Sequence, residues 1–315
     1  MSAMRRTMSR QPDDLERILS DWAPVEPVAE RLAGRRTFLV GTGSSWHAAN
    51  QGAYLLRLAG LEAWPVQAAD CALYGPSPTP SDALIVLSHR GTKRYAALVL
   101  AQARETGVPH VLVAGQGAPG ADLETVEQEE SSAFTASHLG ALARLTQLAV
   151  VLGAKLPDLG SVPEAVARSL EAPTPFVSPP ARGLQFIGAG PNHWTAVEGA
   201  LKVRETARIF AAGHSVEEFL HGPSVAIGAD DGVVVLEGGG PAEARIAEVA
   251  VAAEAVGSRV YRVADRSLAE PLSIFPLTVA VQRIALECAE ALDTDPDRFG
   301  FDVPGREEAW GAIEL

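Results

Sequence analysis

TFLVGTGSSWHAA, residues Thr37–Ala49, joins an apolar run to a helical pattern through two glycines. Thr37–Val40 predicts a buried strand, while Gly41 and Gly43 predict a tight turn that leads into a helix. In a parallel sheet such a turn lies at the carboxyl edge of a strand, where the first N–H groups of the helix can meet an anion. The stretch therefore predicts one strand–turn–helix unit of an α/β fold.

Five more apolar runs bounded by Gly or Pro alternate with helical patterns along the chain. They are Ala83–Leu87, His110–Val113, Leu184–Ile187, Val233–Leu236 and Arg259–Val263. This alternation predicts parallel sheets with helices on both faces. A Pro-, Ser- and Ala-rich stretch predicts a linker with one helix, so the expected organisation is a helical extension (1–36), a first domain (37–155), the linker (156–183) and a second domain with a C-terminal tail (184–315).

An internal repeat relates the two predicted domains. At a fixed offset of 147 residues (188 minus 41), the glycines and small residues of the first turn and helix recur in the second half. DALIVLSHRG (Asp82–Gly91) likewise resembles DGVVVLEGGG (Asp231–Gly240). Repeated units of this kind predict one fold used twice.

Three positions on the first helix of each copy change from largely apolar to charged. Gln51, Leu55 and Leu58 of the first copy become Glu198, Lys202 and Glu205 in the second. The spacing i, i+4, i+7 places the charged residues on one helical face. The plain alternative is an exposed Glu–Lys pair. Only three of the 26 basic residues are lysine, however, so a lysine here favours a role that needs a compact ammonium group.

The composition of the chain indicates which kinds of binding partner and which cellular compartment to expect. The formal net charge of -13 over 315 residues argues against nucleic acid, which needs a basic face. Cys71 and Cys288 form no CxxC pattern, so neither a disulfide framework nor a thiolate metal site is expected. The sequence has no run of about 20 apolar residues, so no membrane association is expected. These features predict a cytoplasmic protein.

Two loops offer amides and hydroxyl groups for an anion. Ser44 and Ser45 follow the first glycine turn, and SHRGTK (Ser88–Lys93) follows the next buried strand. Both loops open a helix at the same predicted sheet edge, so they could close around one phosphate. The alternatives are a simple N-cap at Ser44 and solvated surface charges at Arg90 and Lys93.

His221 precedes Gly-Pro in EEFLHGP, a sharp turn that would project the imidazole from a fixed backbone. Histidine titrates near neutral pH, so a general acid or base role is chemically reasonable. A structural histidine is the alternative. No HxxxH or HExxH spacing occurs, and no metal site is predicted.

VEGALKVRE (Val197–Glu205) followed by HGP, with Glu205 and His221 sixteen residues apart, resembles the signature of the sugar-isomerase (SIS) family. The same signature resembles that of the isomerase part of glucosamine-6-phosphate synthase and its relatives, and the likeness extends from about Thr37 to Asp295. The resemblance implies two tandem flavodoxin-like SIS domains and a homodimer whose site takes residues from both subunits.

The resemblance also implies roles for the charged residues. Glu205 corresponds to the base that moves a proton between C1 and C2 of the sugar. His221 corresponds to the ring-opening acid or base, contributed across the dimer. Glu198 and Lys202 correspond to supporting groups near the reactive end of the sugar. No cofactor is needed for this chemistry.

Phosphate-binding positions follow in the same way. Ser44, Ser45 and Ser88 match them, and Ser131 in ESSAFTAS falls near another substrate-contacting serine. The family pattern SxSGxT here reads SHRGTK. Phosphate or sugar contacts are therefore expected from the remaining loop residues, which are His89, Thr92 and Lys93.

Two departures limit the comparison with the synthase. The first expected strand begins near Thr37, so the synthase's glutaminase domain is expected to be absent. The tail FGFDVPGREEAWGAIEL (Phe299–Leu315) contains no lysine, whereas the synthase uses one near its C-terminus to form a Schiff base with the sugar. The expected function is thus isomerisation or deamination of a phosphorylated sugar or amino sugar. A fructosamine-phosphate deglycase and a non-catalytic phosphosugar sensor are the alternatives.

Overall fold

The computed structural model describes residues 1–173 and 178–313. Residues 174–177 of the predicted linker and 314–315 of the predicted tail lie outside the described residues. The chain forms two compact units, described separately below. The N-sheet unit contains residues 10–129 and 136–160 with Ile313, and the C-sheet unit contains Met1–Ser9, Glu130–Thr135 and the described part of Ser161–Ala312.

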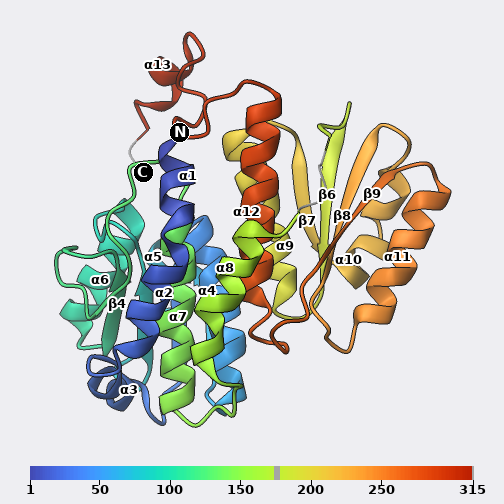
Figure 1. Ribbon diagram of the computed structural model, residues 1–315. Coiled ribbons are helices and arrows are strands. Elements are labelled where there is room, and N and C mark those ends of the chain that lie inside the picture. Colours follow the sequence, from blue (N-terminus) through green and yellow to red (C-terminus); the bar gives the residue numbers. More distant parts are fainter. Residues whose placement is uncertain (174–177, 314–315) are drawn as a thin grey trace. The chain divides into compact units, whose positions relative to one another are not determined.

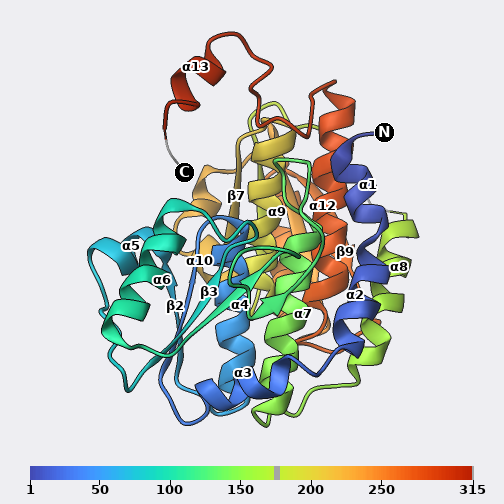
Figure 2. The ribbon, with the colours of Figure 1, turned by 90° about the vertical axis from the view of Figure 1, so that its left-hand side faces the viewer.

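The N-sheet unit is built on a parallel sheet with strand order β2-β1-β3-β4-β5. The strands are β1 (Thr37–Gly41), β2 (Ala63–Gln67), β3 (Ala83–Leu87), β4 (His110–Ala114) and β5 (Leu123–Glu124). Helices cover both faces (Figure 2). One face carries α2 (Gln11–Ser20), α3 (Val25–Leu32), α4 (Ser44–Leu58) and α7 (Ala136–Val151), and the other carries α5 (Ala68–Leu73) and α6 (Arg94–Thr106).

The C-sheet unit has a parallel sheet with strand order β7-β6-β8-β9. The strands are β6 (Gly183–Gly188), β7 (Ala211–Ser215), β8 (Asp231–Glu237) and β9 (Arg259–Ala264). Figure 1 shows helices on both sides of this sheet. They are α9 (Asn192–Thr206) and α12 (Ile274–Ala291), backed by α8 (Val162–Glu171) and α1 (Ala3–Ser9), on one side, and α10 (Val216–Leu220) and α11 (Glu243–Ala255) on the other. Shorter elements are η1 (Leu159–Ser161), η2 (Pro223–Ala226) and α13 (Arg306–Trp310).

All six predicted strands are present, and the prediction of parallel sheets with helices on both faces is confirmed. The sequence did not predict three of the described strands, β2, β5 and β7. Each lies at an edge of its sheet. Edge strands are only partly buried and need no continuous apolar run, so AWPVQ and AAGHS carry a weak signal.

Glycines that match in the sequence repeat perform the same task in both units. A Cβ on Gly52 of α4 would lie 2.6 Å from Cδ1 of Leu145 on α7. A Cβ on Gly199 of α9 would lie 2.8 Å from Cβ of Val281 on α12. In each unit the missing side chain lets the helix that follows β1 or β6 approach a long buried helix.

The ion pairs at the start of β3 and of β8 also correspond. Arg36 Nε donates to Asp82 Oδ1 at 2.9 Å, and Arg182 Nε donates to Asp231 Oδ1 at 2.9 Å. Both aspartates are buried and also accept a backbone N–H of the preceding turn. The arginine partner lowers the pKa of both carboxyl groups.

Among the described helices, none is both long and apolar enough to cross a membrane. The predicted N-terminal extension contains the three helices α1, α2 and α3. The one helix expected in the linker is α8, whose Ser169 Oγ donates to the carbonyl of Pro276 on α12 at 2.7 Å.

Candidate active site

Helix α9 carries a buried cluster of three charges in the C-sheet unit. Lys202 Nζ lies 2.5 Å from Glu205 Oε2 and 3.5 Å from Glu198 Oε1. The side chains of Glu198 and Lys202 are 0% and 1% exposed, whereas that of Glu205 is 19% exposed. The alternative of an exposed Glu–Lys pair is therefore wrong.

Burial makes this cluster expensive. Removing two carboxylates and an ammonium from water costs several kcal/mol per ion, and mutual attraction offsets this cost only in good geometry. The rest of α9 follows ordinary helix rules, with Ala196, Ala200 and Val203 in the apolar core. A buried charged face on a helix that also packs into the apolar core is typical of a functional site.

His221 ends α10 and points to solvent. Its side chain is 81% exposed, and its Nε2 lies 3.7 Å from Glu217 Oε2. In the part of the chain that the structure describes, no recorded contact joins His221 to the charged cluster of α9. The imidazole projects at the Gly222-Pro223 turn, as expected from the sequence. The alternative that His221 is a structural histidine inside the protein is therefore wrong.

The first anion loop of the N-sheet unit follows β1. Gly43, with φ +58°, is the N-cap of α4 and supplies no side-chain cap. Ser44 and Ser45 therefore occupy the first two helical positions, and Ser44 is not a simple N-cap. A Cβ on Gly41 would overlap the Ser45 carbonyl, so only glycine allows the helix to begin this close to the strand.

The second anion loop follows β3, the strand beside β1. Ser88 Oγ is fully buried and has no hydrogen-bond partner among the described residues. Arg90, Thr92 and Lys93 are exposed, and Lys93 is the N-cap residue of α6. Because β1 and β3 are neighbours, both loops lie at one carboxyl edge, at the point where the strand order reverses direction.

Comparison with known proteins agrees with this arrangement. The chain is 25% identical over 268 residues to a glutamine–fructose-6-phosphate aminotransferase (isomerizing) of Chlorobaculum tepidum. It matches the C-terminal domain of a glucosamine-fructose-6-phosphate aminotransferase from Francisella tularensis with a TM-score of 0.78 at 16% identity, covering 95% of this chain and 98% of that one. The resemblance to the sugar-isomerase family is confirmed.

A further solved structure with the same fold is tagatose-6-phosphate ketose/aldose isomerase from Escherichia coli, with a TM-score of 0.75 at 18% identity over 94% of this chain and 95% of that one. The Chlorobaculum match covers 74% of this chain and 44% of the relative. The chain thus spans about half the length of the curated relatives it matches. No family model matches the sequence.

Two residues expected to contact ligand in a sugar-isomerase site have backbone partners instead. His89 is 8% exposed, and its Nε2 accepts the N–H of Glu129 at 3.0 Å. Burial lowers the pKa of His89. Ser131 belongs to the C-sheet unit, is fully buried, and its Oγ accepts the N–H of Ala133 at 3.2 Å.

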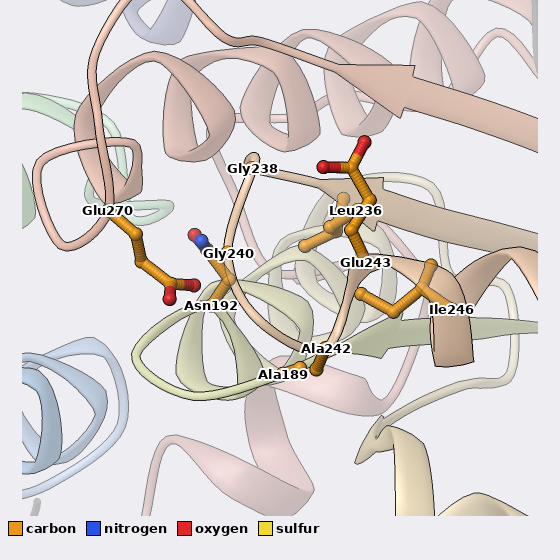
Figure 3. A pocket seen from close by; sticks show the side chains of 9 residues that line it. All are labelled: Ala189, Asn192, Leu236, Gly238, Gly240, Ala242, Glu243, Ile246 and Glu270. Carbon is orange, nitrogen blue, oxygen red and sulfur yellow. The ribbon is translucent and has the colours of Figure 1, made fainter.

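The C-sheet unit has a small pocket at the corresponding sheet edge, after β6 and β8 (Figure 3). Its volume of about 10 Å³ is the space of one water molecule. Glu270 directs its carboxylate toward Gly240 and Asn192, and burial raises the pKa of this carboxyl group. A carboxylate here disfavours a second phosphate. The described residues contain no group of three His, Cys, Asp or Glu side chains suited to a metal.

Two residues of the N-sheet unit were not predicted as site residues. His138, 2% exposed on α7, has its Nδ1 3.1 Å from the Ser44 carbonyl oxygen. Glu129, 3% exposed, accepts the N–H of Ser137 through Oε1 at 2.8 Å. Neither belongs to a sequence motif, so only the folded chain reveals their proximity to the anion loops.

Proposed function

We propose that this protein binds a phosphorylated sugar or amino sugar and isomerises or deaminates it by proton transfer between C1 and C2. The observation that carries the proposal is the buried cluster of Glu198, Lys202 and Glu205. A hydrophobic face would stabilise α9 at lower cost, so a chemical role accounts for charges that packing does not require.

The exposure of each side chain in the cluster suggests its role in the reaction. Glu205 is the accessible member, so its carboxylate takes the proton from one carbon and returns it to the next. Lys202, 2.5 Å away, supplies a positive charge for the developing enediol oxygen. Glu198 holds the ammonium from its other side at 3.5 Å and offsets its charge. This chemistry requires no cofactor.

The two anion loops are proposed to hold the phosphate. Ser44, Ser45 and Ser88 offer hydroxyl groups, together with the N-terminal amides of α4 and α6. Thr92 and Lys93 add an exposed hydroxyl and an ammonium group beside them. The buried hydroxyl of Ser88 lacks a partner among the described residues, which supports a ligand at this position.

The assembly proposed for this function has tandem SIS domains at 37–155 and 184–315, paired as a homodimer in the cytoplasm. Matching glycines and ion pairs support the repeat. The 81% exposure of His221 supports a role at the site of a partner subunit, as the ring-opening acid or base. Ser131 is proposed as a further sugar contact.

Release of an amine from a fructosamine phosphate is a second candidate reaction. Its specific support is the scarcity of lysine: Lys93, Lys155 and Lys202 are the three lysines of the chain, and Phe299–Leu315 has none. A substrate that carries its own nitrogen needs no Schiff base from that segment.

A direct test incubates the protein with fructose 6-phosphate, glucosamine 6-phosphate and fructosamine 6-phosphates in deuterated water. The proposal predicts deuterium entry at C1 or C2 of at least one compound, followed by NMR, and the product identifies the reaction. Binding of these compounds without any exchange would instead establish a phosphosugar sensor.

A further inference from the structure

We propose that His138, Glu129 and His89 form a bridge through the start of α7 that fixes the distance between the two anion loops. The inference rests on the proposed function, because it concerns the same phosphate site. It assigns His89 and His138 as positioning residues that act through the backbone of the loops.

The bridge begins at the first anion loop. His138 lies in the first turn of α7, and its Nδ1 donates to the Ser44 carbonyl at 3.1 Å. Ser44 is the first residue of α4, so this bond holds the helix start whose amides face the proposed ligand. An imidazole that is 2% exposed has little freedom to move.

The middle of the bridge is Glu129, the last residue of the N-sheet unit before the chain returns to this unit at α7. Its Oε1 accepts the N–H of Ser137, the neighbour of His138, at 2.8 Å. This bond caps the N-terminus of α7, where a negative charge is favoured. The carboxylate and His138 are therefore attached to adjacent residues of one rigid helix.

The bridge ends at the second anion loop. His89 follows Ser88 directly, and its Nε2 accepts the N–H of Glu129 at 3.0 Å. Its carbonyl oxygen accepts the N–H of Gly115 at 2.8 Å. A Cβ on Gly115 would lie 2.6 Å from Cε1 of His89, so this glycine makes room for the ring.

The direction of the last bond requires a neutral His89. Nε2 can accept the Glu129 N–H only when it carries no proton. Burial lowers the pKa of His89, the nearby Arg90 acts in the same direction, and Glu129 opposes them. The imidazole thus remains an acceptor at neutral pH. A histidine on the surface, without this burial, would be protonated in a larger fraction of molecules.

The position of the bridge gives it a functional consequence. The loops follow the neighbouring strands β1 and β3, so one phosphate would touch both. If either histidine is removed, each loop keeps its own strand and helix. The distance between the two loops is then no longer fixed by the hydrogen bonds of the bridge. Breaking the bridge at one point should therefore have nearly the same effect on phosphate affinity as breaking it at two.

The experiment is a double-mutant cycle on the full chain. His89→Ala, His138→Ala and the double variant are compared with the wild type for binding of inorganic phosphate by calorimetry and for thermal stability. His89→Gln keeps an acceptor at the reach of Nε2, and His138→Asn keeps a donor at the reach of Nδ1. His110→Ala is the matched control, because His110 Nδ1 also bonds a backbone carbonyl, that of Val108, at 2.9 Å. His110 is the first residue of β4, so it lies at the sheet edge opposite to the anion loops.

Each single Ala variant is expected to weaken phosphate binding about tenfold, the value of one hydrogen bond, and the double variant no more than about tenfold. His89→Gln, His138→Asn and His110→Ala are expected to bind phosphate as the wild type does. If His89→Ala does not fold, His89→Asn, whose acceptor is one bond too short, replaces it and should bind more weakly than His89→Gln. If His138→Ala does not fold, His138→Leu, which fills the ring volume without a donor, replaces it and should bind more weakly than His138→Asn.

Multiplicative losses in the double variant would overturn the bridge, as would losses of thermal stability without any change in affinity. These results would leave the proposed phosphate site intact, because the wild type would still bind. A wild type that binds no phosphate would overturn both the bridge and the proposed phosphate site.

Discussion

Lys202 is held between two carboxylates inside α9, and this placement makes a strong prediction about stability. Lys202→Met should lower the free energy of unfolding by about 3–5 kcal/mol, because it leaves buried carboxylates without their cation. Urea denaturation measures the loss.

The matched variant is Glu198→Gln/Lys202→Met, which removes the two charges of the cluster that are almost fully buried and leaves the partly exposed Glu205. Most of the lost stability should return in this double variant, because one uncompensated buried carboxylate is removed with the ammonium. Glu198→Gln alone is the second single variant. A double variant as unstable as the sum of Glu198→Gln and Lys202→Met would show that the ion pair is not what stabilises Lys202.

Two histidines predict how stability depends on pH. Burial lowers the pKa of His89 and of His214 below the ordinary value of 6.5. The unfolded chain therefore takes up protons at a higher pH than the folded chain. Stability should be complete above about pH 6.5 and decline as the pH falls from there toward the folded pKa values.

Urea midpoints measured at pH 7.5 and pH 5.5 test this expectation. The decline should be smaller in His89→Gln/His214→Gln than in the wild type. His110→Gln serves as the control histidine change. An equal decline in all three proteins would assign the acid sensitivity to other groups.

The sequence predicted the residues of the charged cluster but could not predict their burial. Comparison of the two repeats located Glu198, Lys202 and Glu205, because their counterparts are mainly apolar. The roles of His89 and Glu129 depend on a hydrogen bond across 40 residues of chain, which no local pattern encodes. The sequence therefore located the charged motif, whereas it gave no indication of the hydrogen bond between Glu129 and His89.

At the scale of elements, the close approach of α9 to α12 and of α4 to α7 depends on one glycine each. Gly199→Ala and Gly52→Ala should both destabilise the protein, by about 1–3 kcal/mol. Gly199→Ala should cost more, because its new methyl group meets Cβ of Val281, whereas that of Gly52→Ala meets the movable end of Leu145.

Chemical denaturation of the two variants provides the measurement. Gly107→Ala separates crowding from backbone strain, because Gly107 has a positive φ of 72° and no atom within 4 Å of its new methyl group. Equal stability of Gly199→Ala and the wild type would show that α9 can move away from α12 without cost.

Most of the strands that the sequence predicted correctly are interior strands; the exception is the edge strand β9, whose residues Arg259–Ala264 are mostly exposed or half-buried. Interior strands such as β3 and β8 need apolar residues throughout, which makes them visible as runs. The edge strands β2 and β7 have half-exposed residues, and β2 contains Pro65. Their pairing depends on the neighbouring strand more than on their own residues, so sequence patterns alone do not locate them.

At the scale of the whole molecule, the proposed homodimer with a site shared between subunits predicts complementation. Glu205→Gln and His221→Ala homodimers should each be inactive, but mixing them in equal amounts should restore about a quarter of wild-type activity. Random exchange makes half of the dimers mixed, each with one intact site of two.

Activity after subunit exchange is the measurement, and each variant mixed with itself is the control. A mixture that stays inactive, although mass spectrometry detects mixed dimers, would contradict a site shared across the dimer. It would also place the exposed His221 outside the chemistry.

In the proposed reaction, the charged cluster of α9 moves a proton between two carbons of a sugar phosphate, with Glu205 as the base. The most direct measurement is the rate of deuterium entry from solvent into the bound sugar, compared between the wild type and Glu205→Gln. Glu248→Gln, an exposed carboxylate change on α11, serves as the control.

We expect exchange to slow by about 10²–10⁴-fold in Glu205→Gln while phosphate binding stays at the wild-type level. Glu248→Gln should exchange at the wild-type rate. Exchange in Glu205→Gln as fast as in the wild type would contradict the account.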